Sequence, residues 1–448
     1  MNDIAWDFSN ENDMFNLFNS EMDFIVRNID SGKAFSKKIA VAVSGGSDSL
    51  SLLILLKNWA AKNGFSLTCI TVDHKLRAES RDEAIFVRDF CNKIGVNHII
   101  LEWNKDNNVV ISHGKIEDFA RSARYNSINE YCEHEAINIV AIGHTWNDQL
   151  ETFEMRKNQK SAELGLAGMS RVRSISKNVK IIRPIMIFSK DYLRKFLISK
   201  KIPWKNDPMN DDSQFKRVFY RKNIASMSRE ELIKKTSEIK SLGKKRHDIE
   251  KRAVSFLKEN IDSEKMKFGY MVFDSAKFLN EEEEIQAEIL KRAIWNIGGK
   301  KYAPTIDKLT LKNIIEQKKI KTLGRCLLKV TKKQIAIFRE NRNLEQQISV
   351  DKNGVFLFDN RFLVSIQNCK FHDGLTKYVI SSRRSFEKIV DEKNRTSELP
   401  HEVVCSLPCV YMNDKLLFDY GIKKNNFEEC ASIKCEFACK VNLFDIFL

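Results

Sequence analysis

The string Ser-Gly-Gly-Ser-Asp-Ser at 44–49 holds the residue types best suited to chemistry in this chain. It follows a β-branched run at 38–43 and precedes a segment that is apolar on a helical period. Two glycines let the backbone approach an anion closely, and a helix start presents free N–H groups and the positive end of its dipole. The arrangement favours a phosphate chain, and Asp48 then indicates a Mg²⁺ ion that bridges the phosphate oxygens. The plainer alternative is a Gly-Gly turn with a polar helix cap.

Two further polar strings, at 73–77 and 143–152, directly follow predicted strands. Ligands of an open parallel sheet bind at the carboxyl ends of its strands, so we expect these strings to converge with 44–49 on one crevice. His144, Asp148 and Glu151 are spaced four and three apart at a helix start and therefore share a face. For the two acids the plainer interpretation is helix-dipole stabilisation, and for the histidine it is a structural imidazole.

Strand and helix patterns alternate from residue 38 to about residue 200. The expected strands are 38–43, 67–72, 97–103, 137–143 and 180–185, and the expected helices are 48–58, 79–94, 116–134, 147–157 and 190–200. Such alternation predicts an α/β fold with a mostly parallel, Rossmann-like sheet. Arg121 and Arg124 share a face of the third helix and suit either a phosphate clamp or a solvated surface.

The pattern changes after Asp207-Pro208. Residues 217–267 are strongly helical and hold 15 Lys and Arg against eight Asp and Glu, and the whole chain carries a net charge of +15. A chain this basic often meets a polyanion. We expect a catalytic domain at 1–215, a helical basic domain at 216–348 and a small α+β domain at 349–448.

Composition excludes several classes of protein. The longest apolar stretch near the start, 50–56, is far shorter than the roughly 20 residues that span a bilayer. The first 25 residues are acidic, unlike a secretory signal, and suit an amphipathic helix instead. Ten cysteines include no C-x-x-C pair, so we expect reduced thiols in a cytoplasmic protein that contacts no membrane.

Several of these strings together resemble a known family, tRNA(Ile)-lysidine synthetase, within the pyrophosphate-loop ATP enzymes. The 44–49 string defines the superfamily, and several later strings are similar to the family itself. Those later strings lie at 72–80, 120–125, 143–152, 164–169, 181–185, 206–217, 322–326 and 337–342.

The resemblance implies a ligase that converts the wobble cytidine, position 34, of CAU-anticodon tRNA(Ile) to lysidine. ATP would adenylate the C2 oxygen, and the ε-amino group of L-lysine would then displace AMP. Both carboxyl-terminal domains would bind tRNA, and a homodimer is left open as an assembly.

The same resemblance implies roles for individual residues. ATP would be held by Ser44, Gly45, Gly46, Ser47, Asp48 and Ser49, with Asp48 also on Mg²⁺. Arg124, Asp148 and Glu151 would serve the activated base and the lysine, and His144 and Arg217 would contact substrate. A carboxylate such as Asp148 would recognise the lysine ammonium and then accept its proton, because only about a thousandth of free lysine is deprotonated near pH 7.4.

The sequence departs from the family pattern at a few positions. Asn147 stands where the family usually has Asp, the segment 157–164 lacks an arginine- and glycine-rich string, and Arg325 stands where a second glycine is common. Three rival functions are a tRNA thiolase, a small-metabolite synthetase and a non-enzymatic RNA-binding protein. The missing cysteine pair disfavours the first, the basic helical region the second and the intact 44–49 string the third.

Overall fold

The computed structural model describes most of the chain. The described residues are 10–29, 36–73, 79–102, 116–159, 161–176, 178–205, 216–300, 302–316, 321–342, 344, 347–369, 378–382, 399–413, 415–421, 424–425 and 430–438. Two compact units account for them, one at 1–247 with the last two residues and one at 248–446. The predicted division into three domains stays a prediction. In the part described, no helix is long and apolar enough to cross a membrane.

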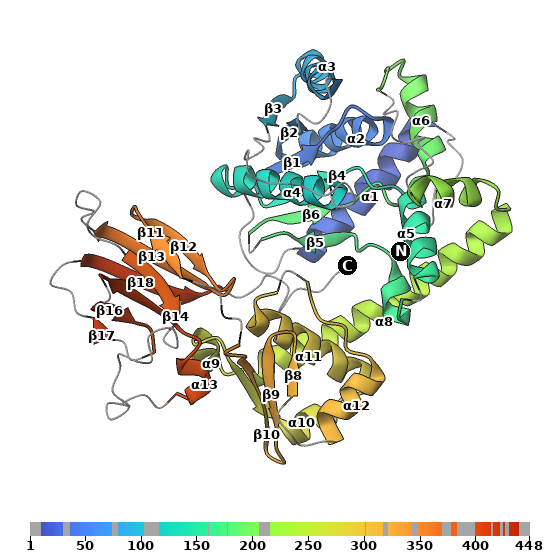
Figure 1. Cartoon of the computed structure of the whole chain (residues 1–448). Helices are drawn as coiled ribbons and strands as arrows, with labels where there is room; N and C mark the ends of the chain where they lie inside the picture. The colour runs from blue at the N-terminus through green and yellow to red at the C-terminus, as the bar shows by residue number, and fades with distance from the viewer. Residues whose placement is uncertain are drawn as a thin grey trace. The chain divides into compact units, whose positions relative to one another are not determined.

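A six-stranded sheet organises the first unit, in the order β3-β2-β1-β4-β6-β5 (Figure 1). The strands are β1 (Lys38–Ala42), β2 (Ser66–Asp73), β3 (Asn97–Glu102), β4 (Ile139–Ile142), β5 (Val172–Ser174) and β6 (Lys180–Ile182). Neighbours from β3 to β6 pair in parallel, whereas the edge strand β5 pairs antiparallel with β6. The predicted α/β fold is therefore confirmed, and β5 is a strand that the sequence pattern did not predict.

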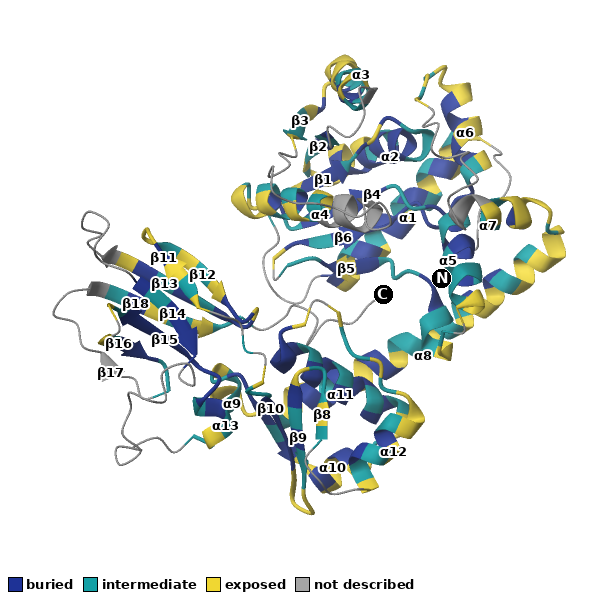
Figure 2. Ribbon diagram, viewed as in Figure 1, coloured by how far each residue is buried: buried dark blue, intermediate teal, exposed yellow. Residues whose placement is uncertain are grey.

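Helices connect these strands as the alternation predicted. They are α2 (Ser47–Asn63), α3 (Glu79–Ile94), α4 (Ile116–His134), α5 (Trp146–Asn158) and α6 (Lys190–Ser199). Ile39 and Val41 of β1 belong to a core shared with α2, α3 and α6, while Ala40 between them belongs to a core shared with α4. Successive strand residues thus point to opposite faces, and both faces are covered by helices, as a parallel sheet requires (Figure 2).

The acidic amino-terminal segment forms α1 (Glu11–Ile29), which joins the core on the α2 side of the sheet. The predicted amphipathic helix buries Phe18 and Ile25 there, together with Met14 and Met22. Phe24 is 43% exposed instead, and the Arg171 guanidinium lies over its ring.

The basic helical region begins with α7 (Lys216–Ala225) and α8 (Arg229–Asn260). Trp146, Leu150 and Phe153 of α5 form a buried cluster with Ile224 of α7 and Ile239 of α8. The first compact unit therefore continues past residue 215, because these helices complete the burial of α5.

The second unit contains three antiparallel sheets. One has the order β7-β10-β9-β8, a second β11-β14-β15-β16-β17 and a third β12-β13-β18. Its strands are β7 (Met271–Asp274), β8 (Lys321–Leu323), β9 (Cys326–Val330), β10 (Gln334–Arg339), β11 (Ile348–Val350), β12 (Gly354–Phe358), β13 (Phe362–Cys369), β14 (Tyr378–Ser382), β15 (Pro408–Met412), β16 (Lys415–Asp419), β17 (Lys424–Asn425) and β18 (Cys430–Phe437). Its helices are α9 (Ser263–Lys267), α10 (Ser275–Leu279), α11 (Glu283–Gly298), α12 (Lys308–Glu316) and α13 (His401–Val404).

A buried charge network lies within this second unit. Arg339 donates two hydrogen bonds of 2.9 Å to the two oxygens of Asp359, and Arg361 donates a third of 2.7 Å to Oδ2. All three side chains have no exposed surface. Because Arg339 ends β10 and the other two residues lie between β12 and β13, the network connects two of the sheets.

Candidate active site

The 44–49 loop connects the end of β1 to the start of α2. Gly45 has φ +88°, a left-handed value that favours glycine. Gly46 is the residue that caps the start of α2. The Ser49 hydroxyl accepts a hydrogen bond from the Ser44 backbone N–H at 3.2 Å and donates one to the Gly46 carbonyl at 3.0 Å. The loop is thereby closed over the start of α2, where backbone N–H groups and the helix dipole attract negative charge.

A glycine also lies where β4 meets this loop. A Cβ atom at Gly143 would lie 3.3 Å from the backbone N and Cα atoms of Ser49. The end of β4 and the first turn of α2 therefore approach each other closely, which brings the 143–152 string beside the 44–49 string, as predicted from the strand ends.

A compact cluster of charges forms at this crossing. The Lys190 ammonium lies 3.1 Å from Asp148 Oδ1 and 3.8 Å from Glu151 Oε1, and Arg221 Nε donates to the same Glu151 oxygen at 2.8 Å. Asp48 belongs to the same group, because its pKa responds to the charges of both Lys190 and Asp148. Three predicted site residues, Asp48, Asp148 and Glu151, are thus brought together.

The pKa values of two of these carboxyl groups move in opposite directions. Burial is the main reason that the pKa of Asp48 rises to about 6, and the negative charge of Asp148 adds to the rise, while Lys190 opposes it. Burial would also raise the pKa of Asp148, but Lys190, His144 and two hydrogen bonds from Thr145 hold it at about 2. Asp148 is therefore a permanent anion and a poor proton acceptor near neutral pH.

Hydrogen bonds at the start of α5 fix the direction of Asp148. Its Oδ2 accepts from the Thr145 backbone N–H at 2.7 Å and from the Thr145 hydroxyl at 2.8 Å, which leaves Oδ1 for Lys190. His144, which directly precedes Thr145, accepts a hydrogen bond at Nδ1 from Arg183 Nε at 3.1 Å. Arg183 is buried, and its Nη1 donates to the Ser170 carbonyl at 2.7 Å. The histidine is therefore held by a contact from beyond β6.

The segment around Gly168 is fastened to α5. Gln149 Nε2 donates to the Met169 carbonyl at 2.7 Å, and the Met169 N–H donates back to Gln149 Oε1 at 2.6 Å. Arg156 Nη1 donates to the carbonyls of Gly165 and Gly168 at 2.7 and 3.0 Å. The predicted family string 164–169 is therefore a structural partner of the helix that carries Asp148 and Glu151.

Other predicted site residues lie apart from these contacts or outside the described side chains. Arg124 is exposed on α4, and none of the contacts described above connects it with the charge cluster. Arg217 lies in α7, but its side chain is outside the described set. The string from His74 to Arg77 and the one at 206–215 are also outside it.

Sequence reasoning missed Lys190 and Arg221. Lys190 begins the helix after β6, so the same strand-end rule that selected Asp148 could have selected it. Arg221 lies four residues after Arg217 on α7 and shares its face, which was a weaker signal.

Two departures from the family pattern have visible consequences. Asn147 Oδ1 accepts a hydrogen bond from the Lys190 backbone N–H at 2.9 Å, so this side chain positions the start of α6 beside the cluster. Arg325 has φ +68°, next to Gly324 at φ +61°, which explains why glycine suits the position.

Comparison with known proteins identifies the family. A model of the PP-loop domain matches residues 18–228. The tRNA(Ile)-lysidine synthase of Wolbachia pipientis wMel is 30% identical over 428 residues, which cover 92% of this chain and 96% of that protein. The chain belongs to the tRNA(Ile)-lysidine synthase family.

Further lysidine synthases extend the similarity. The enzyme of Orientia tsutsugamushi (strain Boryong) is 31% identical over 343 residues, covering 73% of this chain and 75% of that protein. The enzyme of Wolbachia sp. subsp. Brugia malayi (strain TRS) is 29% identical over 408 residues. The family resemblance inferred from the sequence is thus confirmed, and the PP-loop match makes this lysidine synthase family member an ATP-utilising enzyme of tRNA modification. All five residues of the charge cluster lie within the matched PP-loop domain.

Proposed function

We propose that this enzyme converts the wobble cytidine of CAU-anticodon tRNA(Ile) to lysidine in two steps. The cytidine C2 oxygen attacks the α-phosphorus of ATP, an O–P bond forms and pyrophosphate leaves. The ε-amino nitrogen of L-lysine then attacks C2, the C2–O bond breaks and AMP leaves with that oxygen. The observation that carries the proposal is the placement of Asp148 and Glu151 beside Asp48 at the phosphate loop of a lysidine synthase relative.

The loop at 44–49 is the proposed ATP site. Free N–H groups at the start of α2 and the hydroxyl group of Ser44 would donate hydrogen bonds to the phosphates. Asp48 is half-buried and accepts a hydrogen bond from the Ser47 hydroxyl at 3.1 Å. Its carboxylate oxygens are ligands of the kind that suits Mg²⁺. Bound there, the ion would neutralise charge on the phosphates. No group of three metal-ligating side chains occurs among the described residues, so Asp48 would share the ion with phosphate oxygens and water.

Asp148 and Glu151 form the proposed ammonium site for lysine. Asp148 remains charged because its pKa is about 2, and the Glu151 carboxyl group beside it is 3% exposed and held by Arg221. Lys190 already contacts both carboxylates, and this contact supports the assignment of their oxygens to a primary ammonium. We assign Asp148 to recognition rather than to proton removal, because so acidic a group is a weak base.

The basic helices supply the proposed tRNA contacts. The excess of Lys and Arg in 217–267 suits backbone phosphates, and we assign tRNA binding to the regions 216–348 and 349–448. Arg124 and Arg217 are the proposed contacts to the activated nucleotide, and His144 a contact to substrate. We place the reaction in the cytoplasm, where tRNA, ATP and free lysine are available together. Whether two copies associate is a question for sedimentation.

Mass spectrometry of the tRNA product tests the proposal. An isoleucine tRNA transcript with a CAU anticodon, incubated with the enzyme, ATP and lysine, should gain the mass of lysine less one water. Omitting lysine, or changing the wobble base, should abolish this product. A product that gains sulfur when sulfide replaces lysine, or full AMP release without lysine, would favour the thiolase function instead.

A further inference from the structure

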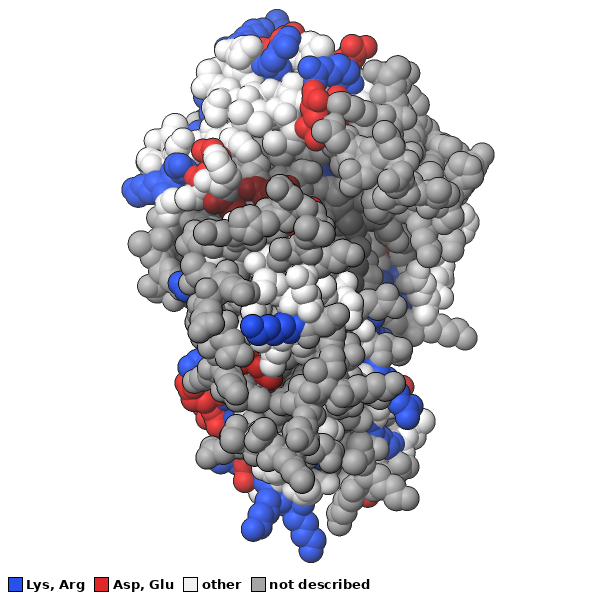
Figure 3. All heavy atoms as spheres, turned by 60° about the vertical axis from the view of Figure 1, so that its left-hand side comes forward, with Lys and Arg blue, Asp and Glu red and all other residues white. Residues whose placement is uncertain are grey.

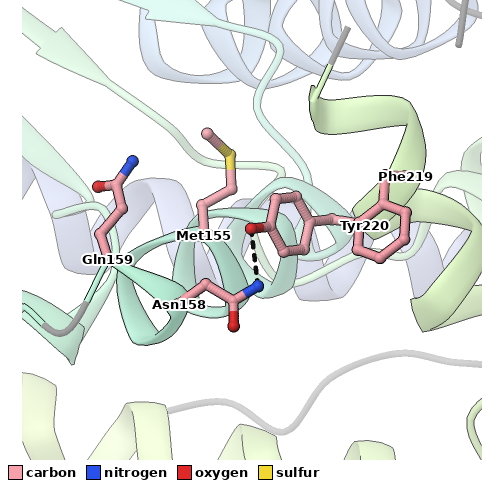
Figure 4. Close-up of a pocket in the computed structure, with 5 residues that line it drawn as sticks. All are labelled: Met155, Asn158, Gln159, Phe219 and Tyr220. Atoms are coloured by element: carbon pink, nitrogen blue, oxygen red, sulfur yellow. Dashed lines mark hydrogen bonds between the residues drawn. The ribbon is translucent and has the colours of Figure 1, made fainter. Parts of the chain in front are cut away.

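A cavity opens between α5 and α7, away from the charge cluster. Its volume is about 340 Å³, and its described lining consists of Met155 and Asn158 from α5, Gln159 directly after that helix, and Phe219 and Tyr220 from α7 (Figure 4). Tyr220 reaches toward α5, where its hydroxyl accepts a hydrogen bond from Asn158 Nδ2 at 2.9 Å. The Phe219 ring meets the Tyr220 ring edge-on, with 5.5 Å between the centroids.

The lining combines the two kinds of group that recognise an unpaired nucleobase. Phe219 is 58% exposed in the first turn of α7, where it presents a large aromatic surface to solvent. Exposed aromatic rings beside a basic surface are the usual platforms on which single-stranded bases stack. The amides of Asn158 and Gln159 offer both donors and acceptors, which suit the hydrogen-bonding edge of a base.

The position of the cavity relates it to the reacting nucleotide. Glu151 and Asn158 lie seven residues apart on α5, so they are about 10 Å apart along the helix axis at 1.5 Å per residue. Tyr220 is also adjacent in sequence to Arg221, which holds Glu151. A base bound in the cavity would therefore belong to a nucleotide close to the one that reacts.

Charge around the cavity favours a nucleic acid. Lys157 and Lys222 are exposed, and each lies within two residues of a lining side chain. These ammonium groups suit backbone phosphates on either side of a bound base. A free amino acid would need a carboxylate and an ammonium partner instead, and the lining residues that the structure describes include no charged side chain.

We propose that this cavity binds an unstacked base of the anticodon loop, one neighbouring the cytidine that is modified. This inference rests on the proposed function, because it takes tRNA as the substrate. Phe219 stacks on the base, and the amides of Asn158 and Gln159 contact its edge. The cavity thereby sets the register of the loop, so that only one cytidine reaches the phosphate loop.

A coupling experiment tests the proposal in the full-length enzyme. Phe219→Ala removes the exposed ring, and Ile198→Ala, at another exposed apolar residue (62% exposed) on α6, is the matched control. KM values for tRNA, ATP and lysine are measured with intact tRNA and with a series of transcripts, each lacking one base of the anticodon loop. Loss of a stacked base typically weakens binding by roughly 5- to 150-fold.

The expected result is specific to one nucleotide. Phe219→Ala should raise the KM for intact tRNA within that range and leave the KM values for ATP and lysine unchanged. The transcript that lacks the bound base should show no further loss with Phe219→Ala, whereas transcripts lacking other bases should show the full loss. Ile198→Ala should match the wild type throughout.

Other outcomes would overturn the proposal. Equal effects of Phe219→Ala on every transcript would mean that no base stacks on the ring. A raised KM for ATP alone would assign the cavity to the adenine base, the other source of the same chemistry. The proposed function is tested independently by the wild-type product, since failure to form lysidine with intact tRNA would refute it whatever Phe219 does.

Discussion

The charges of a few residues near the start of α5 determine which ligands this region can bind. The cluster joins three carboxyl groups, those of Asp48, Asp148 and Glu151, with two cations in direct contact, Lys190 and Arg221, an excess of one carboxyl group. Arg194 and His144 also act on these carboxyl groups at longer range. Such an excess suits cationic ligands, namely a metal ion and a lysine ammonium. The raised pKa of Asp48 indicates a charge that the fold tolerates at a cost, a frequent property of functional sites.

Asp48→Asn should lower ATP-dependent pyrophosphate release by roughly 100-fold or more, because an electrostatic contact to the phosphates is lost. The substitution should not reduce stability, since the elevated pKa of about 6 means that the folded state disfavours the charged form of Asp48. Urea unfolding and a pyrophosphate assay check both statements. Asp89→Asn, at a residue 62% exposed on α3, is the control and should change neither. Near-normal turnover by Asp48→Asn would refute the metal assignment.

Glu151→Gln should raise the KM for lysine by about 10- to 100-fold, because a hydrogen bond to a charged group is typically worth about 1.5–3 kcal/mol. Glu154→Gln provides a matched control one turn along the same helix. Glu154 pairs with Lys235 at 2.6 Å instead of with the cluster, so its substitution should leave the KM unchanged. Steady-state kinetics with lysine varied decides the question, and equal effects of the two variants would show that helix charge alone matters.

The segment at 163–169 illustrates control at the scale of the element. It is a short 3₁₀ turn, Glu163–Ala167, followed by Gly168 at φ +67° and ψ −157°. Gln149, Arg156 and Arg246 all donate to or accept from its backbone. The turn therefore braces α5, whose first turns carry Asp148 and Glu151.

Gly168→Ala should destabilise the enzyme by about 1–3 kcal/mol, because only glycine adopts this backbone region without strain. A Cβ atom there would also lie 2.4 Å from Gln149 Oε1. Gly243→Ala should act in the opposite sense. Gly243 lies inside α8 with nothing within 4 Å of its added Cβ, so alanine should stabilise by about 0.5–1 kcal/mol. Urea denaturation of both variants is the measurement, and a shift of the same sign in both would contradict this account.

The candidate functional features described above lie in the first of the two compact units. The first contains the phosphate loop, the charge cluster and the cavity, and the second is built mainly from antiparallel sheets. Many basic residues of the helical region bind acids of the protein itself, such as Lys235 with Glu154 and Arg252 with Glu281. On the face drawn in Figure 3, Lys and Arg side chains are interspersed with Asp and Glu among the residues described.

Salt should weaken tRNA binding strongly. If the helical region contacts several phosphates, raising salt from about 50 to about 200 mM should lower the affinity for tRNA by orders of magnitude through counterion release. Filter binding at several salt concentrations measures the slope. ATP affinity at constant Mg²⁺ should fall far less over the same range, which makes it the internal reference. An affinity for tRNA that is indifferent to salt would mean that these helices are merely solvated.

Asp359→Asn should lower the free energy of unfolding of the second unit, because it leaves Arg339 and Arg361 buried without a counter-charge. Breaking a buried pair typically costs about 3–5 kcal/mol. Burial opposes ionisation of Asp359, but the two arginines lower its pKa below the ordinary value. The contribution is therefore complete above about pH 4, the ordinary pKa of Asp, and is lost as the pH falls further.

Urea midpoints at pH 7 and below pH 4 test this expectation. The difference between wild type and Asp359→Asn should shrink at the acidic pH, and Asp351→Asn, at an exposed residue of the same unit, should match the wild type at both. A difference that does not depend on pH would mean that shape rather than charge is responsible.

Local sequence patterns determined the order of elements and the phosphate loop. β-branched runs and helical periods depend on neighbours within a few residues, and they predicted β1 to β4, β6 and the helices between them correctly. The 44–49 string was identifiable for the same reason, since its glycines and hydroxyls act together over six positions. The short edge strand β5 escaped, because three residues carry too little periodicity.

Only the tertiary structure decided which groups complete the site. Lys190 lies 42 positions from Asp148 and Arg221 lies 70 positions from Glu151, so no local pattern connects either pair. The acidity of Asp148 likewise depends on burial and on charges brought from other elements, and its low pKa argues against the proton-accepting role expected for that residue. Distance along the chain is the physical reason: parallel crossovers bring remote strand ends together, and the energies of charged groups are set by that assembled environment.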